Sequence, residues 1–143
     1  MPLTYREAIM QALVAKLSEL GGTVIRNPED VYEGPYPAFL VYDGEQDADN
    51  SNHGLTRYRM TVPVEIIVQS SATDIGTALN AKYGEVVAKL ADDPTLGGVA
   101  VDLFETSTTN PDIDETRASK RVGTIGIAFA VDYMTETGNP FVG

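Results

Sequence analysis

The chain has 143 residues, of which 43% are hydrophobic and 22% are charged, and this is the length and composition of one globular domain spanning residues 1–143. Ten basic and 21 acidic residues give a net charge of −11, which argues against a protein that binds nucleic acid or anionic membranes through clustered cations. The absence of cysteine and the presence of one histidine, His53, exclude disulfide scaffolds, thiol nucleophiles and histidine-rich zinc sites.

Two segments show the three- and four-residue spacing of apolar positions that predicts a helix with one buried face. In the first, Thr4 and Glu7 fit a capping box, in which the Thr hydroxyl accepts from a backbone N–H and the Glu side chain reaches back to the cap. This helix extends to Leu20, and the glycine pair that follows ends it. The second helix is predicted from about Asp74, its N-cap, to Leu90.

Apolar and polar residues alternate over two long segments, Leu55–Gln69 and Arg121–Thr135, which predicts two strands that each bury one face. The residues expected to face inward are Tyr58, Met60, Val62, Val64, Ile66 and Val68 in the first strand, and Ile125, Ile127, Phe129, Val131 and Tyr133 in the second. The residues expected to face outward are Arg57, Arg59, Thr61, Glu65 and Gln69 in the first, and Val122, Thr124, Gly126, Ala128, Ala130 and Asp132 in the second. Because the second outward set is mostly small, we expect an open sheet face that another molecule can approach closely.

The length of these strands predicts that they do not fit inside a compact domain. About 15 residues would reach about 50 Å, which exceeds the width of a domain of this size. We therefore expect part of each strand to project as a hairpin arm or to bend sharply. Pro63 has no N–H for a sheet ladder, so the first long strand is expected to lie at a sheet edge or to carry a bulge near that residue.

Shorter strands are predicted at Ala38–Tyr42 and Val99–Thr106, with a further short one at Thr23–Ile25. Two polar segments, Asp43–His53 and Ser107–Thr116, are expected to be mobile loops between paired strands. The order of the elements predicts an α+β fold: a mainly antiparallel sheet with two helices packed on one face and a projecting long β-hairpin or strand extensions.

The first polar segment resembles a calcium-binding loop only in part. Asp47, Asp49 and Ser51 have the alternate spacing of EF-hand ligands. The glycine and the bidentate glutamate that such a loop requires are Asn52 and Tyr58 here, so the pattern fails. A solvated acidic loop is the favoured interpretation.

Other candidate sites for chemistry also lack the pattern they need. Asp112, Asp114 and Glu115 could gather a cation, but no flanking helices frame them as a calcium loop. Asp102 and Asp132 lie at outward strand positions, where carboxylates are more often solvated or interface charges than a catalytic pair. No G-x-S-x-G elbow accompanies His53. We therefore predict a protein that is not an enzyme and that binds no cofactor and no metal ion.

Five basic residues lie near the starts of the two long strands and are expected to cluster if those strands pair. They are Arg57, Arg59, Arg117, Lys120 and Arg121. With the net charge negative, an acidic patch on a partner protein is a more fitting ligand for them than nucleic acid. Long strands, polar loops and an open face of small side chains together favour a protein that works by assembling with copies of itself.

Several segments, taken in chain order, carry a resemblance to a known family. They are the opening helix from Arg6 to Leu20, the PYPAFLV strand at 35–41, the long strand from Tyr58 to Val68 with a helix directly after it, the LADDPTLGG turn at 90–98, and the closing strand Ile125–Tyr133 with Met134-Thr135 and Asn139-Pro140 behind it. Over nearly the whole chain this arrangement resembles the tail terminator proteins of long-tailed phages and related prophage elements, the lambda minor tail protein U type, also called tail completion proteins.

The resemblance implies a structural virion protein that forms a hexameric ring on the end of the finished tail tube. Such a ring stops subunit addition, through a head-to-tail contact that closes after one turn, and presents a surface for joining the head. Its partners would be further copies of itself, the major tail tube protein and a head-connector or neck protein, with DNA only as cargo and no membrane. Its place would be the head-proximal end of the tail in the virion, after assembly in the host cytoplasm.

Under this interpretation two surfaces have expected roles. The subunit or tube interface is expected to include Arg57, Arg59, Thr61, Glu65, Arg117, Lys120, Arg121 and Thr124. The acidic loop that faces the lumen or the tube is expected to include Asp43, Glu45, Asp47 and Asp49.

Two alternatives stay open at this point. One is another neck or tail-tube component of the same particle, since tube proteins share a related design of sheet and helix by family analogy. The more distant one is a small acidic cation-dependent hydrolase or cation-binding module that uses Asp47, Asp49, Asp112 and Asp114.

Overall fold

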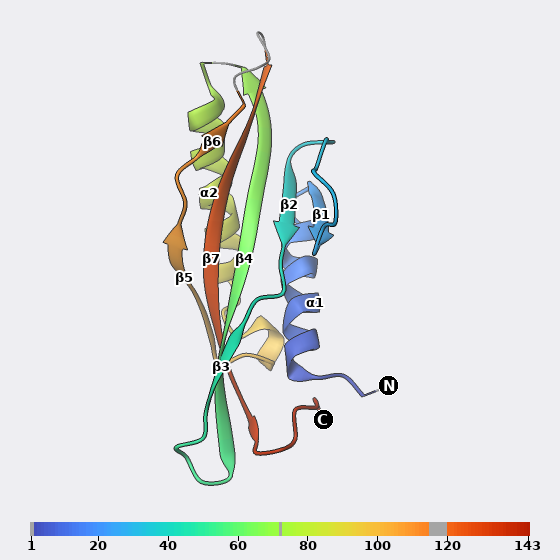
Figure 1. The fold of residues 1–143 in the computed structure, drawn as a ribbon, viewed down its shortest axis with the longest axis vertical. Helices are drawn as coiled ribbons and strands as arrows, with labels where there is room; N and C mark the ends of the chain where they lie inside the picture. The colour runs from blue at the N-terminus through green and yellow to red at the C-terminus, as the bar shows by residue number, and fades with distance from the viewer. Residues whose placement is uncertain (1, 72, 115–119) are drawn as a thin grey trace.

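The computed structural model describes residues 2–71, 73–114 and 120–143, and in it two helices accompany a seven-stranded sheet (Figure 1). The predicted α+β fold is confirmed, and of the described strand pairs all but β1 with β2 are antiparallel. In chain order the elements are α1 (Tyr5–Ser18), β1 (Thr23–Arg26), β2 (Ala38–Val41), β3 (Gln46–Asp49), β4 (Leu55–Ser71), α2 (Ile75–Ala91), a short 3₁₀ turn (Leu96–Gly98), β5 (Asp102–Thr108), β6 (Asp112–Ile113) and β7 (Lys120–Glu136).

The two long strands, β4 and β7, form the centre of the sheet. They pair along their whole length, from Leu55 opposite Glu136 to Ser71 opposite Lys120. β2 and then β1 extend the sheet on one side of this pair, and β5 extends it on the other. β3 pairs with the first part of β4, and β6 with the first part of β7.

The end of the sheet that carries Leu55 and Glu136 reaches below both helices in Figure 1, and we call it the lower end. With 17 residues each, β4 and β7 span about 56 Å. They are not a hairpin with each other, because α2, β5 and β6 lie between them in the chain. The hairpin at the lower end is formed by β3 with the first part of β4.

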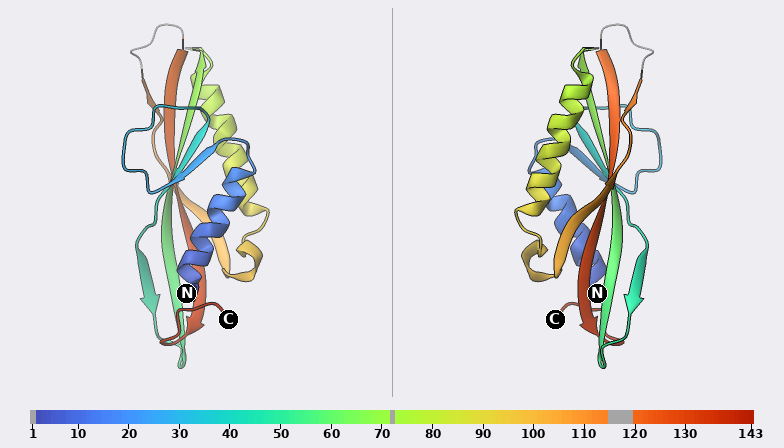
Figure 2. Two further views of the ribbon diagram at one scale, coloured as in Figure 1. Left: turned by 90° about the vertical axis from the view of Figure 1, so that its right-hand side faces the viewer. Right: turned by 90° about the vertical axis from the view of Figure 1, so that its left-hand side faces the viewer.

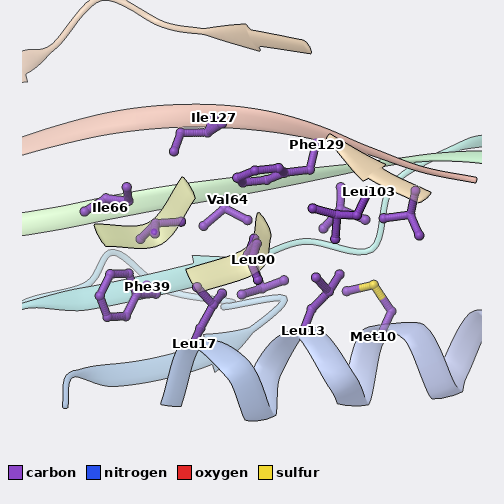
Figure 3. Close-up of a cluster of buried hydrophobic side chains, with 14 of the residues drawn as sticks. Met10, Leu13, Leu17, Phe39, Val64, Ile66, Leu90, Leu103, Ile127 and Phe129 are labelled. Carbon is purple, nitrogen blue, oxygen red and sulfur yellow. The ribbon is translucent and has the colours of Figure 1, made fainter. Parts of the chain in front are cut away.

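The face of the sheet predicted to point inward does so, and we call it the inner face. One hydrophobic cluster joins side chains of this face to side chains of both helices. Figure 3 shows Leu13 and Leu17 of α1 and Leu90 of α2 directed at Phe39 of β2 and at the long strands. Each of these side chains is almost fully buried, and burying one leucine contributes about 1.5–3 kcal/mol. The three- and four-residue spacing of the helices and the two-residue spacing of the strands therefore serve the same core.

The opposite, outer face is not open along its whole length, which corrects the sequence-based expectation. On its upper half Ile67 is buried with Ala38 and Leu40 in a second cluster, against which Tyr32 and Tyr36 pack. These two tyrosines belong to residues 27–37, which lie on the side of the sheet away from the helices (Figure 2). A connection without regular structure thus covers part of the face that alternation had marked as exposed.

The row of small outward residues on β7 is also partly covered. Ala130 is buried, and the Gly126 N–H donates to the hydroxyl of Thr109 across 2.8 Å. A Cβ at Gly126 would lie 3.2 Å from that hydroxyl oxygen, so the side chain of Thr109 packs closely against the strand at this position. The missing side chain at Gly126 therefore makes room for a residue of the same chain.

Pro63 lies in the middle of the sheet, so the edge-strand alternative is wrong. The β4–β7 register passes through Pro63 without a shift. On the other side of β4, Val41 pairs with Val64 and Gln46 pairs with Met60. The chain from Val41 to Gln46 advances by five residues while β4 advances by four, so one extra residue is accommodated opposite this part of β4. The irregularity that proline requires is carried by the link between β2 and β3, opposite Pro63.

Both helices begin where the sequence predicts, but only part of the predicted N-terminal capping is present. The hydroxyl of Thr4 accepts from the N–H of Glu7 across 3.0 Å, as predicted for the cap of α1. The second predicted bond of the capping box, in which the Glu7 carboxylate would accept from the backbone N–H of Thr4, is wrong, because this carboxylate binds Arg26 instead. Asp74 occupies the position before α2, but its carboxylate accepts from the hydroxyl of Ser71 and makes no capping bond.

Both segments expected to be mobile loops contain strands. In the first, residues 46–49 form β3; in the second, β5 continues to Thr108 and β6 follows at Asp112–Ile113. β5 also begins later than predicted, at Asp102, and its register with β7 shifts between Glu105 and Ser107. Residues 115–119 of the second segment lie outside the described residues.

Candidate assembly surface

The basic residues expected to form one cluster lie at opposite ends of the sheet. Arg57 pairs with Met134 at the lower end, whereas Lys120 pairs with Ser71 at the upper end. Because the long strands are antiparallel, 14 residues of β7, or about 46 Å, separate the two positions. The lower group is Arg57 and Arg59, the upper group is Lys120 and Arg121, and Arg117 lies outside the described residues.

At the lower end a row of charged side chains crosses four strands on the outer face. The register places Asp47 of β3, Arg59 of β4, Asp132 of β7 and Asp102 of β5 side by side. Arg59 binds Asp132 through two hydrogen bonds, of 2.8 and 2.9 Å, and its guanidinium carbon lies 5.2 Å from the ring centre of Phe104. The pairing with Asp132 raises the pKa of Arg59. Arg59 therefore separates carboxylates that would otherwise repel one another.

The acidic stretch predicted as one exposed loop has two different parts. Asp43 is structural, because Arg26 donates to both of its oxygens across 2.7 and 2.6 Å while also binding both oxygens of Glu7. Arg26 lowers the pKa of both carboxyl groups, and the carboxylates in turn raise the pKa of Arg26. This arrangement ties α1, the end of β1 and the end of β2 together.

The other part of the acidic stretch is exposed on β3 and beside it. Asp47 and Asp49 are exposed and pair with Arg59 and Arg57 of β4. The side chain of Glu45 is exposed, while its carbonyl accepts from the N–H of Thr61 across 2.9 Å. A backbone that looked too polar to fold becomes a strand because β4 offers it a hydrogen-bonding edge.

The remaining predicted interface residues lie along the middle and the top of the sheet. Thr61 and Thr124 are half-buried on the outer face, and Glu65 accepts from the hydroxyl of Tyr42 across 2.7 Å. At the upper end Lys120 is exposed, whereas Nε of Arg121 is buried and has no hydrogen-bond partner within the described residues. The predicted set is thus spread over the full length of the sheet.

Sequence reasoning missed an apolar patch at the lower end. Of the six exposed large hydrophobic side chains in the described residues, five lie there, and we call them the lower-end patch: Leu3, Val101, Met134, Phe141 and Val142. Val101 and Met134 line a groove of about 450 Å³ together with Arg57, Arg59 and Asp132. Met134 and Phe141 line a second groove of about 440 Å³, and the Val142 N–H donates to the carbonyl of Leu3 across 2.7 Å.

The sequence contains only a weak indication of this apolar patch. Met134 is an apolar residue at an outward position directly after the last inward residue of β7, and Phe141-Val142 is an apolar pair behind a proline. Nothing in the sequence says that residues 3, 101, 134 and 141 are neighbours. Their proximity depends on the pairing of Thr4 with Phe141 and on the bond between the Val101 N–H and the Asp132 carbonyl.

The structure does not assemble the proposed cation site. Asp47 lies in the same row as Asp132 of β7, whereas Asp112 pairs with Thr124, eight residues or about 26 Å away along that strand. Among the described residues no group of three or more Asp, Glu or His side chains is placed to hold a metal ion. A module using Asp47, Asp49, Asp112 and Asp114 together is therefore wrong for this fold.

None of the helices within residues 2–71, 73–114 and 120–143 is both long enough and apolar enough to cross a membrane.

Comparisons with known proteins identify similar folds and no family. No protein-family model matches the chain, and no curated protein matches it. Among solved structures, a protein named only by a sequence number aligns with 87% of this chain and 94% of its own at 16% identity, with a TM-score of 0.50. A chain from the virion of a native gene transfer agent particle aligns with 90% of this chain and 95% of its own at 19% identity, with a TM-score of 0.47. At these identities the first likeness concerns the fold alone, and the TM-score of the second is too low to carry an argument.

Proposed function

We propose that the protein is a structural component of a phage-like particle that forms a ring on the end of the tail tube, ends tube growth and offers the surface to which the head is joined. The observation that carries the proposal is the lower-end patch on the extension of the two central strands. Exposed apolar patches rimmed by polar residues mark protein–protein interaction sites. Val101, Met134 and Phe141 line two grooves that share Met134, and Leu3 and Val142 lie next to Phe141.

The charges around the patch suit a protein interface. Interfaces combine an apolar centre with a polar rim, and charges of both signs fix the register of the partners. The rim of the patch carries Arg57 and Arg59 together with Asp47, Asp49 and Asp132. Arg57 is exposed and lies opposite Asp49 of β3, and its guanidinium is accessible to a partner from solvent.

The continuity of the two central strands supports the same role. The lower end is an extension of the two central strands, whose register continues unbroken through 17 residue pairs. A ring of more than two copies needs a head-to-tail contact in which two different surfaces meet. The lower-end patch would be one of these surfaces, and it would meet another part of the neighbouring copy.

Deletion of the gene, followed by complementation, tests the proposal. In the strain that produces the particle, loss of the protein should give abnormally long or headless tails in electron micrographs. Met134→Asp and Arg57→Glu should leave these tails uncorrected, because the first places a charge in the patch and the second reverses the charge of Arg57. Gln69→Asp is the control for Met134→Asp: it adds the same single negative charge at an exposed position near the other end of β4 and should restore normal tails.

Folding must be checked separately. All three variants should unfold at wild-type urea concentrations, since the altered side chains are surface-exposed. A deletion strain without any tails would indicate a tube protein instead. Headed tails of normal length in the deletion strain, or in a strain with well-folded Met134→Asp, would contradict the proposal.

A further inference from the structure

A third groove, of about 470 Å³, lies on the upper half of the outer face, and we call it the upper groove. Its floor is apolar and belongs to the sheet: Leu40 of β2, Ile67 of β4 and Val122 of β7. Residues 30–36 form its outer wall, on the side of the sheet away from the helices (Figure 2). The groove is thus built between the sheet and the irregular segment that covers it.

Three tyrosines line the walls of the upper groove. The rings of Tyr32 and Tyr36 meet edge to face, with centres 5.8 Å apart. The third, Tyr42, donates its hydroxyl to Glu65 across 2.7 Å, and burial together with this bond raises its pKa to about 12. Tyr42 therefore remains a neutral donor at physiological pH and fixes the position of the carboxylate.

The described residues that line the upper groove carry charge of one sign. Besides the tyrosines, the ionisable side chains among them are Asp30, Glu33, Glu65 and Asp114, and none of these described residues is basic. Asp30 and Glu33 are exposed and form no ion pair with any described residue. At the rim Val31 is 88% exposed, which is the highest value among the large hydrophobic side chains of the described residues.

This combination of aromatic walls, an apolar floor and carboxylates suits the side chain of lysine or arginine. The methylene stem packs on apolar surface, the cation interacts with aromatic rings, and the carboxylates bind its N–H groups. We propose that the upper groove binds a basic segment of a partner protein, with a lysine or arginine side chain between the tyrosines and the acidic rim. This interaction is separate from the lower-end patch and goes beyond the proposed capping role.

A peptide titration tests the proposal with a probe of defined charge. The probe is an eight-residue peptide in which Arg and Gly alternate, and its control contains citrulline, which is neutral and similar in shape, in place of Arg. In NMR titrations of the full chain, the Arg peptide should shift the signals of residues 30–42, 65–67 and 122–124, and the citrulline peptide should not. The affinity should fall as salt is added, since charges at the surface are screened.

Matched variants distinguish binding in the upper groove from non-specific attraction to the negatively charged surface. Asp30→Asn with Glu33→Gln should weaken binding of the Arg peptide at least tenfold. Asp47→Asn with Asp49→Asn removes the same charge from exposed positions on β3 and should weaken it less than twofold. Tyr36→Leu keeps an apolar side chain but removes the ring, so it should weaken binding by about threefold.

Four results would overturn the proposal. They are equal weakening by the two acidic double variants, equal shifts with the citrulline peptide, shifts produced by calcium chloride alone, and shifts of the same residues with protein concentration when no peptide is present. The last result would mean that a second copy occupies the groove. None of these outcomes affects tail length in the deletion strain, so failure here is distinguishable from failure of the proposed function.

Discussion

Replacing Gly44 with alanine is the sharpest test of how the lower end is attached to the rest of the fold. Gly44 lies in the link between β2 and β3, opposite Pro63. A Cβ at this position would lie 1.6 Å from the carbonyl oxygen of Thr61 and 2.7 Å from its carbonyl carbon. The neighbouring atom is backbone in a central strand, so it cannot rotate away, and the link itself must move.

The cost of that movement follows from the contacts it breaks. The Thr61 N–H donates to the Glu45 carbonyl across 2.9 Å, and the guanidinium of Arg6 donates to the carbonyl of Gly44. Losing one or two hydrogen bonds costs about 1 kcal/mol each, and forcing a methyl group into filled space costs about 1–3 kcal/mol. We expect Gly44→Ala to lower the free energy of unfolding by about 2–4 kcal/mol, or the melting temperature by about 5–15 °C.

Urea unfolding followed by far-ultraviolet circular dichroism measures this change, with Gly84→Ala as its control. Gly84 is an exposed residue inside α2, and a Cβ there would meet no heavy atom within 4 Å. The same substitution should therefore stabilise the protein by about 0.5–1 kcal/mol, because alanine favours a helix over glycine. If Gly44→Ala proves as stable as the wild type, the link does not press against β4 and the reasoning is wrong.

Three further predictions concern stability. Gly123→Ala places a Cβ 2.7 Å from the end of the Leu79 side chain, which can move. The substitution should therefore lower the free energy of unfolding by about 1–3 kcal/mol, less than Gly44→Ala does. An unchanged midpoint of urea unfolding would contradict this prediction. Arg26→Met should cost about 1–3 kcal/mol at neutral pH. Because Arg26 lowers the folded-state pKa of two carboxyl groups, their stabilisation is complete above the ordinary pKa of about 4 and is lost as pH falls through the lowered values. A difference between variant and wild type that does not shrink as the pH is lowered below about 4 would contradict this account. Arg59→Met should leave the midpoint of urea unfolding close to that of the wild type, because the side chain of Arg59 is largely exposed, and a clear loss of stability would show a structural role that the contacts do not support.

The sequence predicted the faces of the elements well because burial repeats with a fixed period. The alternation along β4 and β7 sorts inner from outer residues correctly from Met60 to Val68 and from Ile125 to Tyr133. Spacing of three and four residues likewise identifies the buried side of both helices. These are local properties, and each residue carries its own part of the signal.

What the sequence did not predict depends on pairing between distant segments. Antiparallel pairing sends the starts of β4 and β7 to opposite ends of the sheet, which separates Arg57 from Lys120. The polar segment QDAD forms β3 only because β4 extends far enough to pair with it. Tyr32 covers the outer face from a connection that has no periodicity to read.

The candidate surfaces show the same division. Exposure of Arg57 follows from its position on the long strand and was predicted, whereas exposure of Asp47 and Asp49 was predicted for a loop that proves to contain β3. The lower-end patch joins both ends of the chain to β7, and the upper groove joins residues 30–36 to three strands, so neither is visible in any single segment.

The position of the protein in isolated tails tests the central claim most directly. Tails can be purified from particles that carry an epitope-tagged copy, labelled with gold-conjugated antibody and viewed by electron microscopy. The account predicts label at one end of each tail, the end nearest the head, and none along the tube. Label repeated along the length of the tube would identify a tube subunit, and tails without any label would contradict a role in the particle.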